Sequence, residues 1–317
     1  MGKPSTVAEF EDAGLELSVF QNRNRHSRPR RIVLSSYGRR HGPITRLVSP
    51  SDIGELIKPF VFLDHFEMPW TPESLGGIHP HSGIATLTTV LRGGLAYEDT
   101  TGKKGQVRAG GLEWMKAGNG VWHDGAALKG EALRGYQLWI ALPAAVENAA
   151  PESQYIAPEA VQEEGPVRVV LGRLGAARSP IRAPEGINYF HVRLNDGQRW
   201  RYTPPPGHEV AWLAVDQGKL HAAETISAGR LVVFEESAAA IDVRAEGMTS
   251  FVLGSAIKHP HPLVLGYYSV HTSAAALGQG EAEIRRIGQR LHTEGRLSRN
   301  AAIERLRNDF NTEQDKS

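Results

Sequence analysis

Short apolar runs separated by turn-forming residues are the feature that most constrains the fold of this chain. Most runs are about four to eight residues long, and 34 Gly and 19 Pro are spread between them. Runs of this length bounded by turn signals are typical of strands. Their number predicts an all-β sandwich or barrel. The clearest runs are RIVLSS, PFVFLDHF, ATLTTVLRG, YQLWIALP, VRVVLG, EVAWLAV, RLVVFEE and TSFVLGS.

Helical periodicity is confined to the C-terminal stretch. There Ile284, Ile287 and Leu291 recur at the spacing of one helix face. The later segment RNAAIERLRNDF indicates a second short helix before a polar end. We expect these helices to cover the outside of a sheet.

The segment ALPAAVENAAPESQYIAPEAVQEEG joins two halves of similar texture and is the predicted domain boundary. We therefore predict four parts. They are a flexible N-terminus (1–24), an N-terminal barrel with the functional site (25–150), a C-terminal barrel without one (151–275) and a helical extension (276–317).

The charge balance gives no argument for nucleic-acid or membrane partners. Lys and Arg number 36 and Asp and Glu 35, which leaves a net charge of +1. Seven arginines lie between residues 23 and 40, but they lack the repeatedly interleaved aromatic residues of a nucleic-acid-binding arm. We interpret them as part of a solvated strand and its loops, and we predict no direct nucleic-acid binding.

The chain has no cysteine, so disulfides, thiolate ligands and a cysteine nucleophile are excluded. Any metal must be held by nitrogen and oxygen. The start of the chain lacks the pattern of a signal peptide, and no run of 18 apolar residues occurs. These features predict a cytoplasmic protein without a membrane span.

The stretch GIHPHSGIATL suggests a metal site. If residues 78–91 form a strand, His79 and His81 leave the same face and can reach one ion. Pro80 cannot donate to a ladder, so it belongs at a strand start or an edge. A third ligand is expected from the glycine-rich turn AGNGVWHDG, which contains His123.

Other polar residues in these regions have simpler interpretations. The segment YEDTTGKKG, which contains Glu98 and Asp99, is expected to form a hairpin. A second HPH motif at His259 and His261 is followed at once by Pro262, which resists strand formation. We interpret that second motif as a loop without a ligand role.

These residues lead to a family resemblance. The segments FVFLDHF, HPHSGIATLTTVLRGGLAYEDTTGKKGQVRAGGLEWMKAGNGVWHDG and HPLVLGYYSVHT resemble the pirin family of the cupin superfamily. The resemblance covers about residues 30–275 and is specific over 59–125. It implies a bicupin of two stacked antiparallel jelly-roll barrels, with one iron site in the N-terminal barrel. Three family ligands match His79, His81 and His123.

The fourth family ligand, a glutamate, falls at Gly125. Asp124 should point to the opposite face from His123 on an extended backbone, so it ligates only if the turn is irregular. A catalytic carboxylate in place of the glutamate would come from Asp124 or Glu113.

Three further residues are predicted near the site. His65 is expected as a pocket residue or as a support of the ligands. Trp122 and Trp114 are candidates for lining a substrate pocket, with burial in the barrel core as an equal alternative.

Three imidazoles suit one divalent transition metal, and Fe, Zn, Ni, Cu and Co all remain open on donor chemistry. Iron is implied by the resemblance, as is activity of the quercetin 2,3-dioxygenase type. The substrates would then be a flavonol or related small aromatic molecule and dioxygen. Two alternatives stay open: a regulatory protein whose metal site modulates binding of a protein partner, and a site that no longer holds metal.

Overall fold

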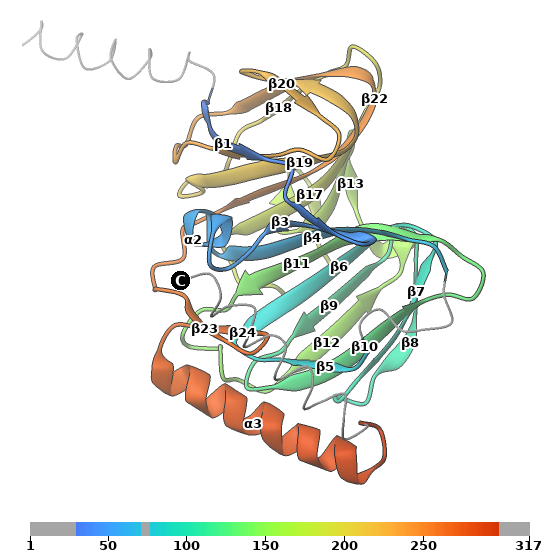
Figure 1. Ribbon diagram of the computed structural model, residues 1–317. Helices are drawn as coiled ribbons and strands as arrows, with labels where there is room; N and C mark the ends of the chain where they lie inside the picture. Colours follow the sequence, from blue (N-terminus) through green and yellow to red (C-terminus); the bar gives the residue numbers. More distant parts are fainter. Residues whose placement is uncertain (1–29, 71–76, 298–317) are drawn as a thin grey trace, which may run out of the picture.

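The computed structural model describes residues 30–70 and 77–297, and most of them lie in β-strands (Figure 1). The ladders between the long neighbouring strands are antiparallel. The strands form two stacked units, and the first contains the predicted histidines (Figure 1). The prediction of an all-β, two-unit jelly-roll architecture is confirmed.

The first unit is built from a seven-stranded and a four-stranded sheet. The larger sheet contains, in spatial order, β12 (Glu152–Ile156), β9 (Leu112–Lys116), β6 (Ile84–Arg92), β11 (Leu133–Ala141), β4 (Phe60–Met68), β3 (Ile44–Val48) and β2 (Arg39–His41). The smaller sheet contains β5 (His79–His81), β10 (Val121–Ala127), β7 (Gly94–Asp99) and β8 (Lys104–Arg108).

The predicted single strand over 78–91 is two strands, β5 and β6, which belong to different sheets. Gly83 separates them with φ +74°, a left-handed conformation that favours glycine. A Cβ at this position would also collide with the carbonyl oxygen of Val270. The same-face argument for the first two histidines still applies, because both lie within β5.

The second unit is built on one nine-stranded sheet, and the described residues also form two separate two-stranded ladders. The sheet contains β1 (Ile32–Ser36), β21 (Leu231–Phe234), β19 (Val210–His221), β22 (Ile241–Ala256), β17 (Ile187–Leu194), β14 (Val167–Leu171) and β13 (Glu163–Glu164), with β18 (Arg199–Tyr202) paired to β22 and β20 (Thr225–Ser227) to β19. The ladders are β15 (Arg173–Leu174) with β16 (Ala177–Arg178), and β23 (Val264–Gly266) with β24 (Ser269–His271), of which the latter lies against the first unit (Figure 1).

A shared apolar core joins the two units. It takes side chains from β4, β6, β9 and β11 of the first unit and from β14, β17, β19, β21 and β22 of the second. Trp114 and Trp212 are fully buried in it, and the ring of Phe60 meets that of Trp212 edge-on at 5.4 Å. For Trp114, the structure therefore supports the core alternative.

The C-terminal helix α3 (Ala274–Thr293) lies across the outer side of the first unit (Figure 1). Ile284, Ile287 and Leu291 are buried, as the helical spacing predicted. The remaining helical elements of the described residues are the short α2 (Ile53–Ile57) and the single 3₁₀ turn η1 (Pro158–Ala160). No described helix has the length and apolarity needed to cross a membrane. The predicted flexible segment 1–24 and the second helix in RNAAIERLRNDF lie outside the described residues.

Two segments cross the predicted domain boundaries. Strand β1, placed by the prediction in the first barrel, pairs with β21 of the second unit. Strand β24, placed in the second barrel, contacts β6, and Ser269 forms a parallel bridge with Ser82 of the first unit. The chain therefore connects the two units at three places rather than at one linker.

The packing of Trp212 on Gly254 gives a stability prediction. A Cβ at Gly254 would lie 2.5 Å from the indole ring, so Gly254→Ala must displace a tryptophan of the shared core. We expect a loss of about 1–3 kcal/mol in the free energy of unfolding, measured by chemical denaturation. Gly278→Ala is the matched control, because a Cβ there meets nothing within 4 Å and lies in α3. It should be neutral or stabilise by up to about 1 kcal/mol, and equal losses in both variants would contradict the role of Trp212.

Candidate metal centre

The three predicted histidines lie on two neighbouring strands. Strands β5 and β10 pair antiparallel, with His123 directly opposite His79, and His81 is two residues further along β5. One ring nitrogen from each histidine lies within 4.8 Å of the others. The Nε2 atoms of His79 and His123 are 3.0 Å apart. The period of a strand and one cross-strand pair thus bring all three rings to the same place.

The opposite ring nitrogens face hydrogen-bond acceptors. Nδ1 of His79 lies 2.8 Å from the carbonyl oxygen of Gly77, and Nδ1 of His81 lies 2.9 Å from that of Tyr268. A carbonyl oxygen only accepts, so each Nδ1 carries the proton and each Nε2 presents a lone pair. This arrangement fixes ring orientation in metal sites, where the outer nitrogen of a ligating histidine is normally bonded to a carbonyl or carboxylate.

His81 gives the test of whether a metal fits. Its ring is 0 % exposed, and Nε2 has no hydrogen-bond partner among the described residues. Burial, and then the nearby His79 and His123, hold the pKa of His81 well below its ordinary value, so the ring is neutral. A buried acceptor without a partner is unfavourable. A cation between the three Nε2 atoms would remove that cost, and the donor set suits a transition metal.

Glu113 of β9 lies behind His123, on the side away from the other two histidines. Its Oε1 is 3.7 Å from Nδ1 of His123, and its Oε2 accepts a hydrogen bond from Thr88 at 2.8 Å. The carboxylate is buried. It can orient His123, whereas the sequence placed it in a substrate pocket or as a base.

Asp124 follows the regular alternation of β10. The ladder to β7 runs without a bulge through His123, Asp124 and Gly125, so Asp124 projects from the face opposite His123. Its Oδ1 accepts a hydrogen bond from the amide of Gly125 at 2.8 Å. Within residues 30–70 and 77–297, no carboxylate joins the three histidines as a fourth close ligand. The turn irregularity that ligation by Asp124 would require is absent from this ladder.

His65 and Trp122 occupy other places than the sequence suggested. Nε2 of His65 lies 3.3 Å from Oδ1 of Asp216, in the second unit. Trp122 packs against α3 and donates from Nε1 to the carbonyl oxygen of Ile284 at 2.8 Å. The structure therefore gives His65 a place between the units and Trp122 a place under the C-terminal helix.

The hairpin and the second HPH motif are as predicted. Oδ1 of Asp99 accepts from the amide of Thr101 at 2.7 Å in the turn between β7 and β8. His259 and His261 lie outside the strands and helices, so the loop interpretation is confirmed.

The groups that support His81 from the C-terminal segment were not singled out by the sequence analysis. Tyr268, whose carbonyl oxygen accepts a hydrogen bond from Nδ1 of His81, has φ +51°, the sole positive value among the described residues other than glycine. A strained backbone of this kind persists only when its surroundings hold it. The segment HPLVLGYYSVHT contains Tyr268, but its sequence pattern offered only a family likeness.

A buried polar chain holds this segment against the first unit. Oγ of Ser82 lies 3.0 Å from Nε2 of His271, and Nδ1 of His271 lies 3.3 Å from Oε2 of Glu147. Glu147 also accepts from the amide and the hydroxyl of Thr272, at 2.7 and 2.6 Å. Spacing along the sequence offers no signal for such a contact, because its members come from three distant segments.

Comparison with known proteins agrees with this fold. The family model described as Pirin matches residues 43–140. A pirin-like protein of Caulobacter vibrioides is 32% identical over 199 residues, which are 58% of this chain and 70% of that protein.

Two solved structures share the fold. A quercetin 2,3-dioxygenase from Acinetobacter baumannii has a TM-score of 0.75 at 22% identity, with 82% of this chain and 98% of that chain covered. A bacterial pirin from Escherichia coli in complex with nickel(II) has a TM-score of 0.56 at 21% identity, with 70% of this chain and 95% of that chain covered. The chain belongs to the pirin family of the cupin superfamily.

Proposed function

We propose that His79, His81 and His123 hold one divalent transition metal through their Nε2 atoms. The observation that carries this proposal is the buried Nε2 of His81, which faces two other imidazole nitrogens and has no hydrogen-bond partner among the described residues. Iron is the metal that the family resemblance implies, and Zn, Ni, Cu and Co fit the same donors. The E. coli pirin with nickel(II) is consistent with a site of this kind.

We further propose an oxygenase of the quercetin 2,3-dioxygenase type, acting on a flavonol or related aromatic molecule. When bound, the metal supplies a Lewis-acid centre for a chelating aromatic hydroxyl compound and dioxygen. Aromatic rings adjoin the histidines: Trp139 meets His81 edge-on at 4.9 Å, and Tyr268 lies 5.5 Å from His79. These rings would favour a flat apolar substrate. The name of the A. baumannii neighbour supports the same chemistry.

The protein groups around the metal would act by orientation rather than by proton transfer. Glu113 and the carbonyl oxygens of Gly77 and Tyr268 hold the three rings from behind. Without a glutamate at position 125, a further coordination position is left for substrate. The substrate would then bind as its anion, because no carboxylate of the described residues stands among the ligands to take its proton.

The first experiment compares His81→Ala with His261→Ala. Loss of one of three ligands should abolish stoichiometric metal, measured by elemental analysis of the purified protein, whereas His261 lies in the second HPH motif and its loss should leave metal content unchanged. Oxygen consumption with quercetin should disappear in His81→Ala alone. Stoichiometric metal without turnover of quercetin or other chelating aromatic compounds would contradict the proposed oxygenase activity and favour a regulatory protein. If the wild-type protein binds no metal after reconstitution with iron, both the oxygenase and the metal-dependent regulator are contradicted.

A second experiment separates orientation from proton transfer at Glu113. Glu113→Gln removes the charge behind His123 and should weaken metal affinity by about 10- to 100-fold. Glu67→Gln, an exposed carboxylate on strand β4, is the control and should bind metal as the wild type does. Unchanged affinity in Glu113→Gln, with a lower rate and an altered pH profile, would instead indicate a base.

Position 125 gives a third experiment. Gly125 is two residues from His123 on the same strand, and the nearest atom to a Cβ there would be the end of the Leu95 side chain at 3.2 Å. Gly125→Glu should therefore place a carboxylate beside the histidines and strengthen metal binding by at least about tenfold. Gly125→Gln has the same size without the charge and controls for packing. Equal effects of the two variants would show that no ligand had been added.

A further inference from the structure

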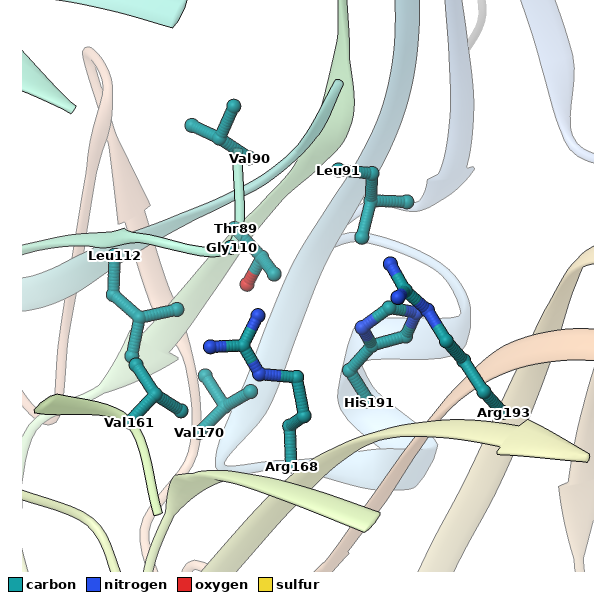
Figure 2. Close-up of a pocket in the computed structure, with 10 residues that line it drawn as sticks. All are labelled: Thr89, Val90, Leu91, Gly110, Leu112, Val161, Arg168, Val170, His191 and Arg193. Atoms are coloured by element: carbon teal, nitrogen blue, oxygen red, sulfur yellow. The ribbon is translucent and has the colours of Figure 1, made fainter. Parts of the chain in front are cut away.

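A pocket between the two units combines positive side chains with a buried hydroxyl. It is lined from the first unit by Thr89 of β6 and by Gly110, and from the second unit by Arg168, His191 and Arg193 (Figure 2). About 250 Å³ of its space is free of protein atoms, and part of that space is open to solvent. The enclosed part is far smaller than the sites of drug-sized molecules and leaves room only for a small ion or group.

Strand pairing brings the positive groups to one face. Arg168 of β14 is directly opposite His191 of β17, and Arg193 follows His191 by two residues. All three side chains therefore leave the same side of the sheet. Burial, followed by the charge of Arg193, lowers the pKa of His191 to about 3; the carboxylate of Asp216 opposes this shift, and Arg168 adds to it. The ring of His191 is therefore neutral, and the positive groups on this face are the guanidinium groups of Arg168 and Arg193.

The guanidinium of Arg168 is held in place from its outer side. It donates from Nη2 to the carbonyl oxygen of Pro158 at 2.8 Å, and its Nε lies 3.1 Å from Oε1 of Glu163. Gly110, at φ +85°, leaves the room that Nη1 occupies, because a Cβ there would collide with that nitrogen. The arginine is therefore positioned by the fold.

Thr89 supplies the second observation. Its side chain is 3% exposed, and the neighbouring polar group is the buried hydroxyl of Tyr189, with which Oγ1 makes at most a poorly aligned hydrogen bond. Figure 2 shows this hydroxyl on the pocket side, facing the guanidinium of Arg168. No acidic residue is among the described residues that line the pocket. A buried hydroxyl that faces one arginine, with a second arginine in the same lining (Figure 2), offers donors to a negatively charged ligand.

We propose that this pocket binds a small oxyanion of the phosphate or sulfate type, bridging the two units. Arg168 and Arg193 supply the charge, and Thr89 donates a hydrogen bond from the first unit. The ligand is either the free ion or the anionic end of a larger molecule whose remainder lies in solvent. The proposal is independent of the metal centre, because Thr88 and Thr89 leave opposite faces of β6 and only Thr88 bonds to Glu113.

The test is calorimetric titration of the metal-free protein with sodium phosphate and with sodium sulfate, at ionic strength held constant with sodium chloride. We expect one saturable site, and a thermal unfolding midpoint that rises with ligand concentration because the ion binds only the folded protein. Metal-free protein is used so that an anion on the metal does not contribute. A titration with glycerol phosphate distinguishes the sources: tighter binding than phosphate indicates an esterified ligand, and weaker binding the free ion.

Variants decide whether the binding is in this pocket. Arg193→Gln should weaken affinity by at least about tenfold, and Thr89→Val should weaken it measurably with the charge unchanged. Arg178→Gln removes an exposed arginine of the same unit outside the pocket and should leave affinity unchanged. Absence of saturable binding, or equal losses in Arg193→Gln and Arg178→Gln, would overturn the proposal.

Discussion

The antiparallel pairing of β5 with β10 is the constraint on which the candidate metal centre depends. It sets His123 opposite His79, while the two-residue period of β5 brings His81 to the same face. Burial, and then the neighbouring rings of His79 and His123, lower the pKa of His81 and keep its ring neutral. Hydrogen-bond acceptors lie at the Nδ1 side of each ring, and the three Nε2 atoms therefore face one another. The strand geometry therefore creates a group of lone pairs for which a cation is the natural partner.

Strands β9 and β6 connect this centre to the packing between the units. Alternation along β9 turns Glu113 toward His123 and Trp114 into the shared core, and alternation along β6 separates Thr88 from Leu87 in the same way. Glu113, which orients His123, thus belongs to a sheet whose other face is held by the packing of Trp114 in the shared core. Rigid elements of this kind hold a site more accurately than loops do.

The sequence was sufficient where the argument rested on local pattern. Short apolar runs predicted the β architecture, the spacing of His79 and His81 predicted a common face, and Ile284 with its neighbours predicted the buried side of α3. It was insufficient where distant segments meet. The contact of His65 with Asp216, the pairing of β1 with β21 and the carbonyl of Tyr268 behind His81 all depend on how the units fold onto each other. No periodicity encodes such contacts.

Tyr268, with its left-handed backbone conformation, contacts a residue that is synthesised much earlier. Its carbonyl lies 2.9 Å from Nδ1 of His81, although 187 positions separate the two residues. During synthesis the histidine strands leave the ribosome long before this tyrosine does. The nascent first unit would therefore contain His81 without the carbonyl oxygen that orients its ring. The final arrangement of the three histidines would form only after the second unit and the segment with Tyr268 have been synthesised.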